Sequence, residues 1–187
     1  MRYLEIRRHT MRTIPGKHLS QPGVALARAL GGGVGPFARV VTSPLPRAIE
    51  TAIAMGFAVD QRLDHLKRID AGVEEEANWW DGFAAFSRAV RRGDVTARYA
   101  GRLAGRWRRL AATLAEETAM LIISHGGIIE AGCVGCLPDA DHAAWGRALD
   151  YCEGVRLAFD GTAFTGAELL RLRDHDPIDQ RITVTAR

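Results

Sequence analysis

The segment AMLIIS, residues 119–124, contains no charged side chain and restricts the fold more than any other stretch of the chain. A short, uninterrupted apolar run predicts a strand that is covered on both faces, as in the centre of a parallel sheet. Residues 2–7 and 38–43 are also predicted to be strands. Because helical segments separate these strands, the pattern predicts an α/β fold.

The helices between the strands begin and end at ordinary signals. Ser20 is the expected N-cap of a helix over residues 21–30, with Pro22 in its first turn, and Ser43 is the expected N-cap of a helix from Pro44 to Met55. The remaining predictions are a strand at 57–63, an irregular connection at 64–82, helices at 82–92, 95–117 and 140–149, a helix that starts within 126–129, and a hairpin over 154–172 that turns at Asp160-Gly161.

These elements predict a three-layer sandwich, with a mostly parallel central sheet, helices on both faces and an antiparallel hairpin at one edge. A chain of 187 residues suits a single domain, residues 1–187, and we expect residues 64–100 to form a lid over the functional site. No apolar run reaches membrane-spanning length, and the N-terminal segment has no apolar signal core. We therefore expect a cytoplasmic protein without a membrane partner.

Two other patterns receive a structural interpretation. The pair Cys133 and Cys136 has neither a second cysteine pair nor a histidine cluster beside it, so buried cysteines are favoured over a metal or redox site. An arginine stripe follows one predicted helix without interleaved aromatic residues, which favours a solvated face and no nucleic-acid partner. The stripe consists of Arg98, Arg102, Arg106 and Arg109.

Chemically active side chains stand at the ends of three predicted strands. The first strand ends in Arg8-His9, the second is followed by Arg47 in the next helical turn, and the central strand ends at His125. Because the carboxyl ends of parallel strands share one edge, these four side chains are expected in one crevice. Two guanidinium groups near helix N-termini suit a phosphate dianion, and a neutral imidazole can attack phosphorus.

These strand ends resemble the motifs of the histidine phosphatase superfamily, which is also called phosphoglycerate mutase-like. The sequence RHT at 8–10 is similar to the family's Arg-His-Gly, and SPLPRAIETA at 43–52 matches Ser-x-x-x-Arg-Ala-x-x-Thr-Ala. The third motif, a strand followed by Ser/Thr-His-Gly-Gly, is matched by LIISHGGII at 121–129. The resemblance extends from residue 2 to about residue 170.

The resemblance implies a role for each of the four residues. His9 would be the nucleophile that becomes phosphohistidine, and Arg8, Arg47 and His125 would hold the phosphoryl group. It implies no metal and no organic cofactor. The expected activity is that of a metal-independent phosphomonoesterase, of the histidine acid phosphatase type, acting on a small phosphate ester. The alternatives are a phosphoglycerate-type phosphomutase and a catalytically weak phospho-ligand binding or regulatory module.

The sequence departs from the family pattern at two positions. Thr10 replaces the usual glycine, and we expect its hydroxyl to donate a hydrogen bond beside the phosphate. Arg68, in LKR, stands where the family has the glutamate that acts as general acid. A leaving alkoxide needs a proton, so Glu74 or Glu75 is the expected acid. The other candidate carboxylates are Asp64, Asp70 and Glu76.

Aromatic residues follow the acidic run. Trp79, Trp80 and Phe83 are expected either to contact an apolar or aromatic leaving group or to hold their segment against the sheet. The sequence leaves the physiological substrate and the oligomeric state open.

Overall fold

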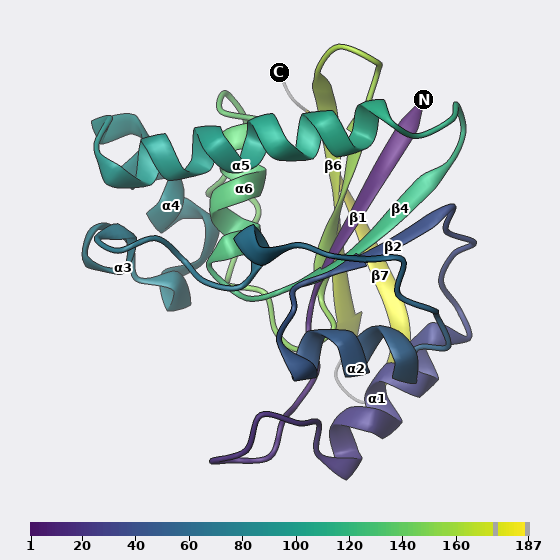
Figure 1. Cartoon of the computed structure of the whole chain (residues 1–187). Helices are drawn as coiled ribbons and strands as arrows, with labels where there is room; N and C mark the ends of the chain where they lie inside the picture. The colour runs from purple at the N-terminus through teal and green to yellow at the C-terminus, as the bar shows by residue number, and fades with distance from the viewer. Residues whose placement is uncertain (174–175, 186–187) are drawn as a thin grey trace.

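The computed structural model describes residues 1–173 and 176–185 of the chain. In this part, seven strands form one mixed sheet in the order β3-β2-β4-β1-β5-β6-β7 (Figure 1). The strands are β1 (Arg2–Arg8), β2 (Arg39–Thr42), β3 (Gln61–Arg62), β4 (Ala119–Ser124), β5 (Gly154–Phe159), β6 (Phe164–Arg173) and β7 (Asp176–Thr185). Strands β1 to β4 pair in parallel and β5 to β7 extend the sheet antiparallel, which confirms the predicted fold class. Residues 174–175 and 186–187 of the expected domain lie outside the described residues.

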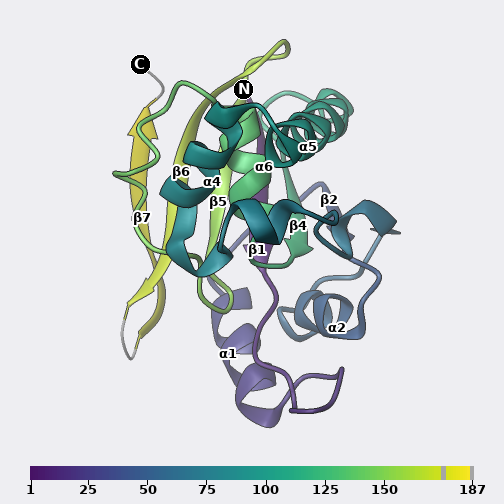
Figure 2. The ribbon, with the colours of Figure 1, turned by 90° about the vertical axis from the view of Figure 1, so that its left-hand side faces the viewer.

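Helices cover both faces of the sheet, as Figures 1 and 2 show. One face packs against α1 (Gln21–Gly31) and α2 (Pro46–Ala54), and the other against α4 (Gly82–Arg92), α5 (Val95–Ala112) and α6 (Ile128–Cys136). The connection between β3 and α4 holds the short helix α3 (Val73–Glu76) and the single turns η1 (Asp64–Leu66) and η2 (Trp79–Asp81).

Strand β4 lies between β2 and β1 and is buried along its whole length. Its side chains alternate between the two layers, because successive residues of a strand point to opposite faces. Met120 and Ile122 join the core beneath α4, α5 and α6, while Leu121 and Ile123 join the core beneath α1 and α2. Two apolar faces explain why the segment has no polar alternation.

The helix predicted at residues 140–149 is wrong, because these residues form turns. Arg171, on strand β6, donates hydrogen bonds to the carbonyl oxygens of Trp145 (3.0 Å), Arg147 (2.6 Å) and Ala148 (3.1 Å). These carbonyls are therefore bound to a distant guanidinium group instead of to the amides of a following helical turn. A contact over this sequence distance leaves no local signal.

Other predicted boundaries were also wrong. Helix α2 begins at Pro46 with Leu45 as its N-cap, so Ser43 does not cap it, and α5 ends at Ala112 rather than at residue 117. The strand predicted at residues 57–63 is reduced to β3, residues 61–62. The Val40 amide of β2 donates to the Asp60 carboxylate at 2.7 Å, so it is not available to a backbone carbonyl of a longer third strand. The β6–β7 hairpin was not predicted.

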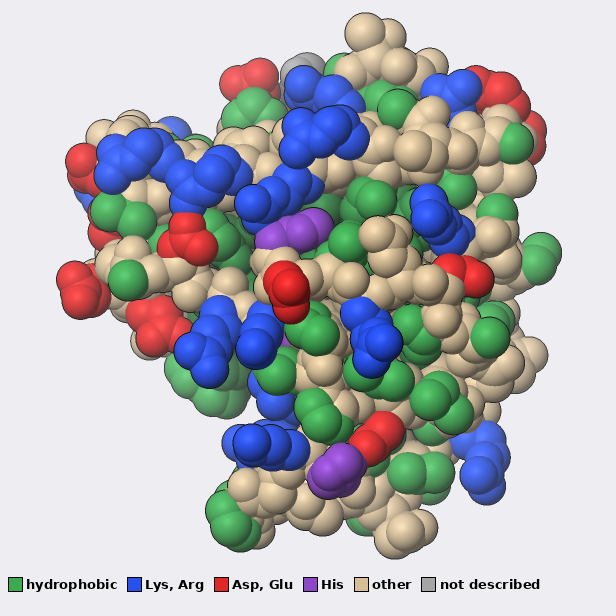
Figure 3. Space-filling view, viewed as in Figure 1, with side chains coloured by type: hydrophobic (Ala, Val, Ile, Leu, Met, Phe, Trp, Pro, Cys, Tyr) green, Lys and Arg blue, Asp and Glu red, His purple; other side chains and the backbone are tan. Residues whose placement is uncertain are grey.

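The structure confirms the interpretation of the cysteines, whereas the absence of a nucleic-acid partner at the arginine stripe stays a prediction. Cys133, Cys136 and Cys152 are buried and free. Lys and Arg side chains follow the lower side of α5 in Figure 3, where Arg98, Arg102 and Arg109 are exposed. Within the described residues, no helix is both long and apolar enough to cross a membrane.

The contact between α5 and α6 depends on a glycine and gives a test of the core. A Cβ added at Gly132 would lie 2.2 Å from the fully buried Trp107 ring. We expect Gly132→Ala to lower the free energy of unfolding by about 1–3 kcal/mol in urea denaturation, because overpacking forces the ring to move. Gly101→Ala is the control, since its Cβ would meet nothing within 4 Å. Equal stability of Gly132→Ala and the wild type would contradict this packing.

Candidate active site

The carboxyl ends of β1, β2 and β4 meet at one edge of the sheet, where Arg8 pairs with Ser124 and Thr42 with Ile123. His9 and His125 follow β1 and β4, and their ring centroids lie 5.0 Å apart. Arg47, in the first turn of α2, reaches the same place. The four residues that the sequence singled out therefore lie together, although they come from three separate parts of the chain.

The imidazole of His9 is held by one acceptor and one donor. Its Nδ1 lies 2.7 Å from the carbonyl oxygen of Thr10, and its Nε2 lies 3.0 Å from Nε of Arg47. A carbonyl only accepts and a guanidinium only donates, so these partners assign the proton to Nδ1 and a lone pair to Nε2. Nε2 is thus the nitrogen available for nucleophilic attack.

Burial keeps both imidazoles neutral. Desolvation lowers the pKa of His9 to about 4, and the positive charges of Arg47 and Arg8 act in the same direction. Desolvation, with the nearby His9, Arg47 and Arg8, lowers the pKa of His125 to about 2. Neither ring is protonated at neutral pH, and an unprotonated ring is what a nucleophile at phosphorus requires.

His125 is oriented by the hydroxyl of Ser43, which lies 2.8 Å from its Nε2. The same hydroxyl oxygen accepts a hydrogen bond from the Leu45 amide at 3.3 Å, which leaves the hydroxyl proton for Nε2. This assignment places a proton on Nδ1 of His125, and that atom is buried without a partner among the described residues. A bound oxyanion can accept a hydrogen bond from this nitrogen only if the His125 ring turns, because the atom is inaccessible in this structure.

Arg8 is fixed between two aromatic rings. Its guanidinium carbon lies 4.5 Å from the Tyr151 ring centroid and 5.0 Å from that of Trp79, which is cation–π geometry. One of its nitrogens donates to the carbonyl oxygen of Leu149 at 2.7 Å. Of the predicted aromatic residues, Trp79 therefore supports the site, Trp80 stacks on it with an exposed outer face, and Phe83 lies in the core.

Thr10 does not present its hydroxyl to a phosphate, and that expectation was wrong. The hydroxyl donates to the carbonyl oxygen of Gly23 in α1 at 3.2 Å, and the Thr10 amide donates to the Thr51 hydroxyl at 3.1 Å. Thr51 in turn donates to the carbonyl oxygen of Arg47 at 2.6 Å. The threonine side chains thus tie the end of β1 to both helices on that face.

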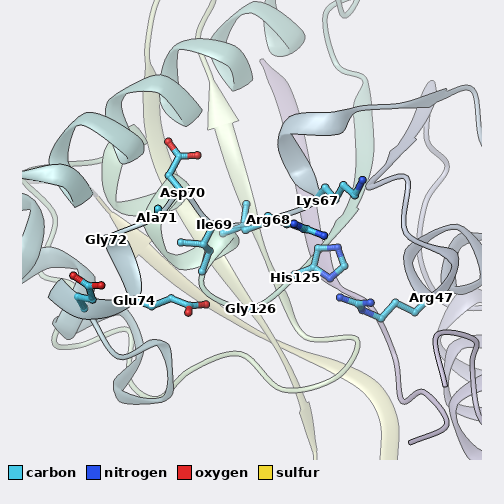
Figure 4. A pocket seen from close by; sticks show the side chains of 12 residues that line it. Arg47, Lys67, Arg68, Ile69, Asp70, Ala71, Gly72, Glu74, His125 and Gly126 are labelled. Carbon is cyan, nitrogen blue, oxygen red and sulfur yellow. The ribbon is translucent and has the colours of Figure 1, made fainter. Parts of the chain in front are cut away.

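Arg47, His125 and Gly126 line one part of a pocket of about 500 Å³. The rest of its wall comes from residues 67–72, from Glu74 and Glu75 on α3, and from Ile128 at the start of α6. Figure 4 shows the Arg47 guanidinium beside the His125 ring, with Glu74 on the far side of the pocket. The segment that the sequence predicted as a lid supplies this second wall.

The candidate carboxylates differ in how they are engaged. Glu76 accepts hydrogen bonds from the amides of Val95 and Thr96, at 3.0 and 2.8 Å. Asp70 lines the pocket, but its carboxylate forms an ion pair with Arg102. Glu74 and Glu75 line the pocket and are exposed. Within the described residues, no three His, Cys, Asp or Glu side chains are grouped to hold a metal ion.

A family model described as "Histidine phosphatase superfamily (branch 1)" matches residues 7–171. The chain belongs to the histidine phosphatase superfamily. No curated protein matches the sequence.

Solved structures of this superfamily's fold cover most of the chain. Phosphoserine phosphatase from Entamoeba histolytica, solved with 3-phosphoglyceric acid, is 18% identical, with a TM-score of 0.67 over 95% of this chain and 99% of that one. Phosphoglycerate mutase from Bacillus anthracis is 18% identical, with a TM-score of 0.62 over 87% and 90%. Mycobacterial glucosyl-3-phosphoglycerate phosphatase is 19% identical, with a TM-score of 0.59 over 88% and 96%. At these identities the likeness shows the fold.

Sequence analysis missed one buried acidic residue in this histidine phosphatase superfamily member. Glu130, on α6, is completely buried and accepts from the amides of Gly127 (2.6 Å) and Leu149 (2.9 Å). It joins the loop after His125 to the segment whose Leu149 carbonyl holds Arg8. A glutamate inside the apolar segment IIEAGC was the available signal, because buried carboxylates are seldom unpaired.

We expect Glu130→Ala to leave two buried amides without acceptors and to lower the free energy of unfolding by about 1–3 kcal/mol for each. If Glu130 also positions Arg8, inorganic phosphate will bind more weakly to the folded variant, and Glu130→Gln, which keeps one acceptor oxygen, will restore part of the affinity. Titration calorimetry, at a temperature where all variants are folded, measures the affinity of each variant for inorganic phosphate. Reduced stability with unchanged phosphate affinity would show a role in folding alone.

Proposed function

We propose that this superfamily member is a metal-independent phosphomonoesterase that acts on a small phosphorylated substrate through a phosphohistidine intermediate. The observation that supports it best is the state of His9, which is buried, neutral and fixed with its Nε2 lone pair beside Arg47. The His125 ring centroid lies 5.0 Å from that of His9, and the guanidinium of the adjacent Arg8 carries donors suited to phosphoryl oxygens.

In the first step, the Nε2 lone pair of His9 attacks phosphorus and forms an N–P bond while the bond to the leaving oxygen breaks. The imidazole becomes cationic, and its proton stays on Nδ1, from which it is donated to the Thr10 carbonyl oxygen, so this hydrogen bond stabilises the positive charge. In the free protein Arg47 donates a hydrogen bond to Nε2 of His9, so its guanidinium must turn to the phosphoryl oxygens as the attack begins. The arginines then balance the charge on the transferring group.

The leaving oxygen takes a proton from a carboxylic acid, for which we propose Glu74 or Glu75. Both line the pocket that Arg47 and His125 share, and both are free of the backbone bonds that occupy Glu76. In the second step, a water molecule gives a proton to the same carboxylate and attacks phosphorus. The N–P bond breaks, and inorganic phosphate and neutral His9 are regenerated.

A phosphomutase is the second candidate, because a phosphoglycerate mutase is among the structures with this fold. A mutase returns the phosphoryl group to an acceptor hydroxyl instead of to water. A requirement for bisphosphoglycerate, with no release of inorganic phosphate, would favour the mutase. Binding of phosphate esters without turnover would favour a weak phospho-ligand module.

The covalent step is tested by trapping the intermediate. We expect wild-type protein quenched during turnover of a ³²P-labelled phosphate ester to retain an acid-labile, base-stable label, and His9→Ala to lose the label and to lower kcat by orders of magnitude. His18→Ala is the matched control, because His18 is an exposed histidine paired with Glu50. Near wild-type turnover by His9→Ala would overturn the mechanism.

The acid is tested by changing the leaving group. An alkyl phosphate departs as a strongly basic alkoxide, whereas nitrophenolate departs without a proton. We expect Glu74→Gln or Glu75→Gln to lower kcat for ethyl phosphate by about 100-fold or more and to affect nitrophenyl phosphate far less. Equal losses on both substrates would show a binding role, and unchanged rates in both variants would exclude these two residues as the acid.

A further inference from the structure

The pocket beside the phosphoryl site holds two cations that the proposed chemistry does not use. Lys67 and Arg68 follow the turn η1 and line the same pocket as Arg47 and His125. Figure 4 shows both on the wall next to His125, with Glu74 at the opposite end. Figure 3 shows Lys and Arg side chains gathered between α3 and α2, and acidic side chains around α3. The charges of the pocket are therefore separated rather than mixed.

Neither cation has a side-chain partner in the part of the chain that the structure describes. Among the described residues, no hydrogen bond or ion pair involves the side chain of Lys67 or Arg68, and both are exposed. Their neighbours are engaged, since Asp70 pairs with Arg102 and Glu76 binds the start of α5. Unpaired cations in a concave wall raise the local potential and favour an anionic ligand.

The phosphoryl group alone does not account for four cations. A phosphate dianion is matched by two guanidinium groups, and Arg8 and Arg47 already stand beside His9. Arg68 also occupies the position at which the superfamily resemblance predicts an acidic residue, so the charge has the opposite sign there. This reversal places a cation instead of a carboxylate on the pocket wall at this position.

We propose that Lys67 and Arg68 form a second anion site, so that the preferred substrate has a carboxylate or a second phosphate on its leaving group. The proposal rests on the proposed function, because it names the substrate class of that site. The fork of Arg68 suits either oxyanion, and Lys67 adds a compact positive charge next to it. Glu74 and Glu75 remain on the other wall to protonate the leaving oxygen.

Matched substrates test the second anion site. We expect wild-type kcat/KM to be about 10- to 100-fold higher for phosphoglycolate than for ethyl phosphate, because a charge-assisted hydrogen bond contributes an effect of about this size. Ethane-1,2-diyl bisphosphate compared with 2-hydroxyethyl phosphate tests a phosphate in the same way. The larger of the two ratios identifies the anion that is preferred.

The variants Lys67→Met and Arg68→Met keep an unbranched stem and remove the charge. Each variant is expected to lower the kcat/KM ratio between the substrate that carries the preferred second anion and its partner without that anion. The double variant is expected to bring this ratio near one, while kcat/KM for ethyl phosphate changes little. Arg39→Ala is the control, because Arg39 begins β2 at the opposite edge of the sheet and should leave the ratio unchanged. Ratios near one in the wild type, or ratios unaffected in the double variant, would overturn the anion site while phosphatase activity stood.

Binding separates this inference from the proposed function. 3-Phosphonopropionate and propylphosphonate are the analogues of phosphoglycolate and ethyl phosphate in which a methylene group replaces the cleavable ester oxygen. Calorimetry gives their affinities whether or not the protein turns over a substrate. Tighter binding of 3-phosphonopropionate that is lost in Lys67→Met/Arg68→Met would support the anion site even if no ester is hydrolysed. Equal affinities, together with equal kinetic ratios, would exclude a carboxylate subsite.

Discussion

The site depends on the placement of one imidazole between a carbonyl group and a guanidinium group. The Thr10 carbonyl oxygen holds the proton of His9 on Nδ1, and Arg47 holds the ring so that Nε2 carries the lone pair. Thr51 links the backbones of both partners, because its hydroxyl accepts from the Thr10 amide and donates to the Arg47 carbonyl. A neutral imidazole with an oriented Nε2 lone pair is therefore built into the junction of β1 and α2.

Burying cations beside this imidazole requires compensation, and the chain provides it mainly with backbone carbonyls and aromatic rings. Arg8 is bound by the Leu149 carbonyl and lies between Tyr151 and Trp79, while its carboxylate contact, Asp150, is 3.9 Å away. A tight carboxylate pair would compete with a phosphoryl group for the guanidinium. Neutral partners orient Arg8 and leave its charge available to an anion.

The segment between β3 and α4 gives the site its individual character. The two histidines and two arginines stand at the strand ends and in the first turn of α2, whereas residues 67–75 supply a wall with cations near His125 and carboxylates opposite. This segment is attached to the rest of the molecule through Asp70 and Glu76, which bind α5. Lys67, Arg68, Glu74 and Glu75 have no side-chain partner among the described residues, so substrate choice is expected to depend on them more than on the strand ends.

The sequence alone determined the layers and the four central residues. The apolar run of β4 required cover on both faces, and the parallel order placed Arg8, His9, Arg47 and His125 at one edge. The tertiary structure decided the turns at residues 140–149, the direction of the Thr10 hydroxyl and the carboxylates that face the pocket. Each of these depends on partners far away in the sequence, namely Arg171, Gly23 and the amides that begin α5. Local periodicity reports which face of an element is buried, but not which distant polar group it will meet.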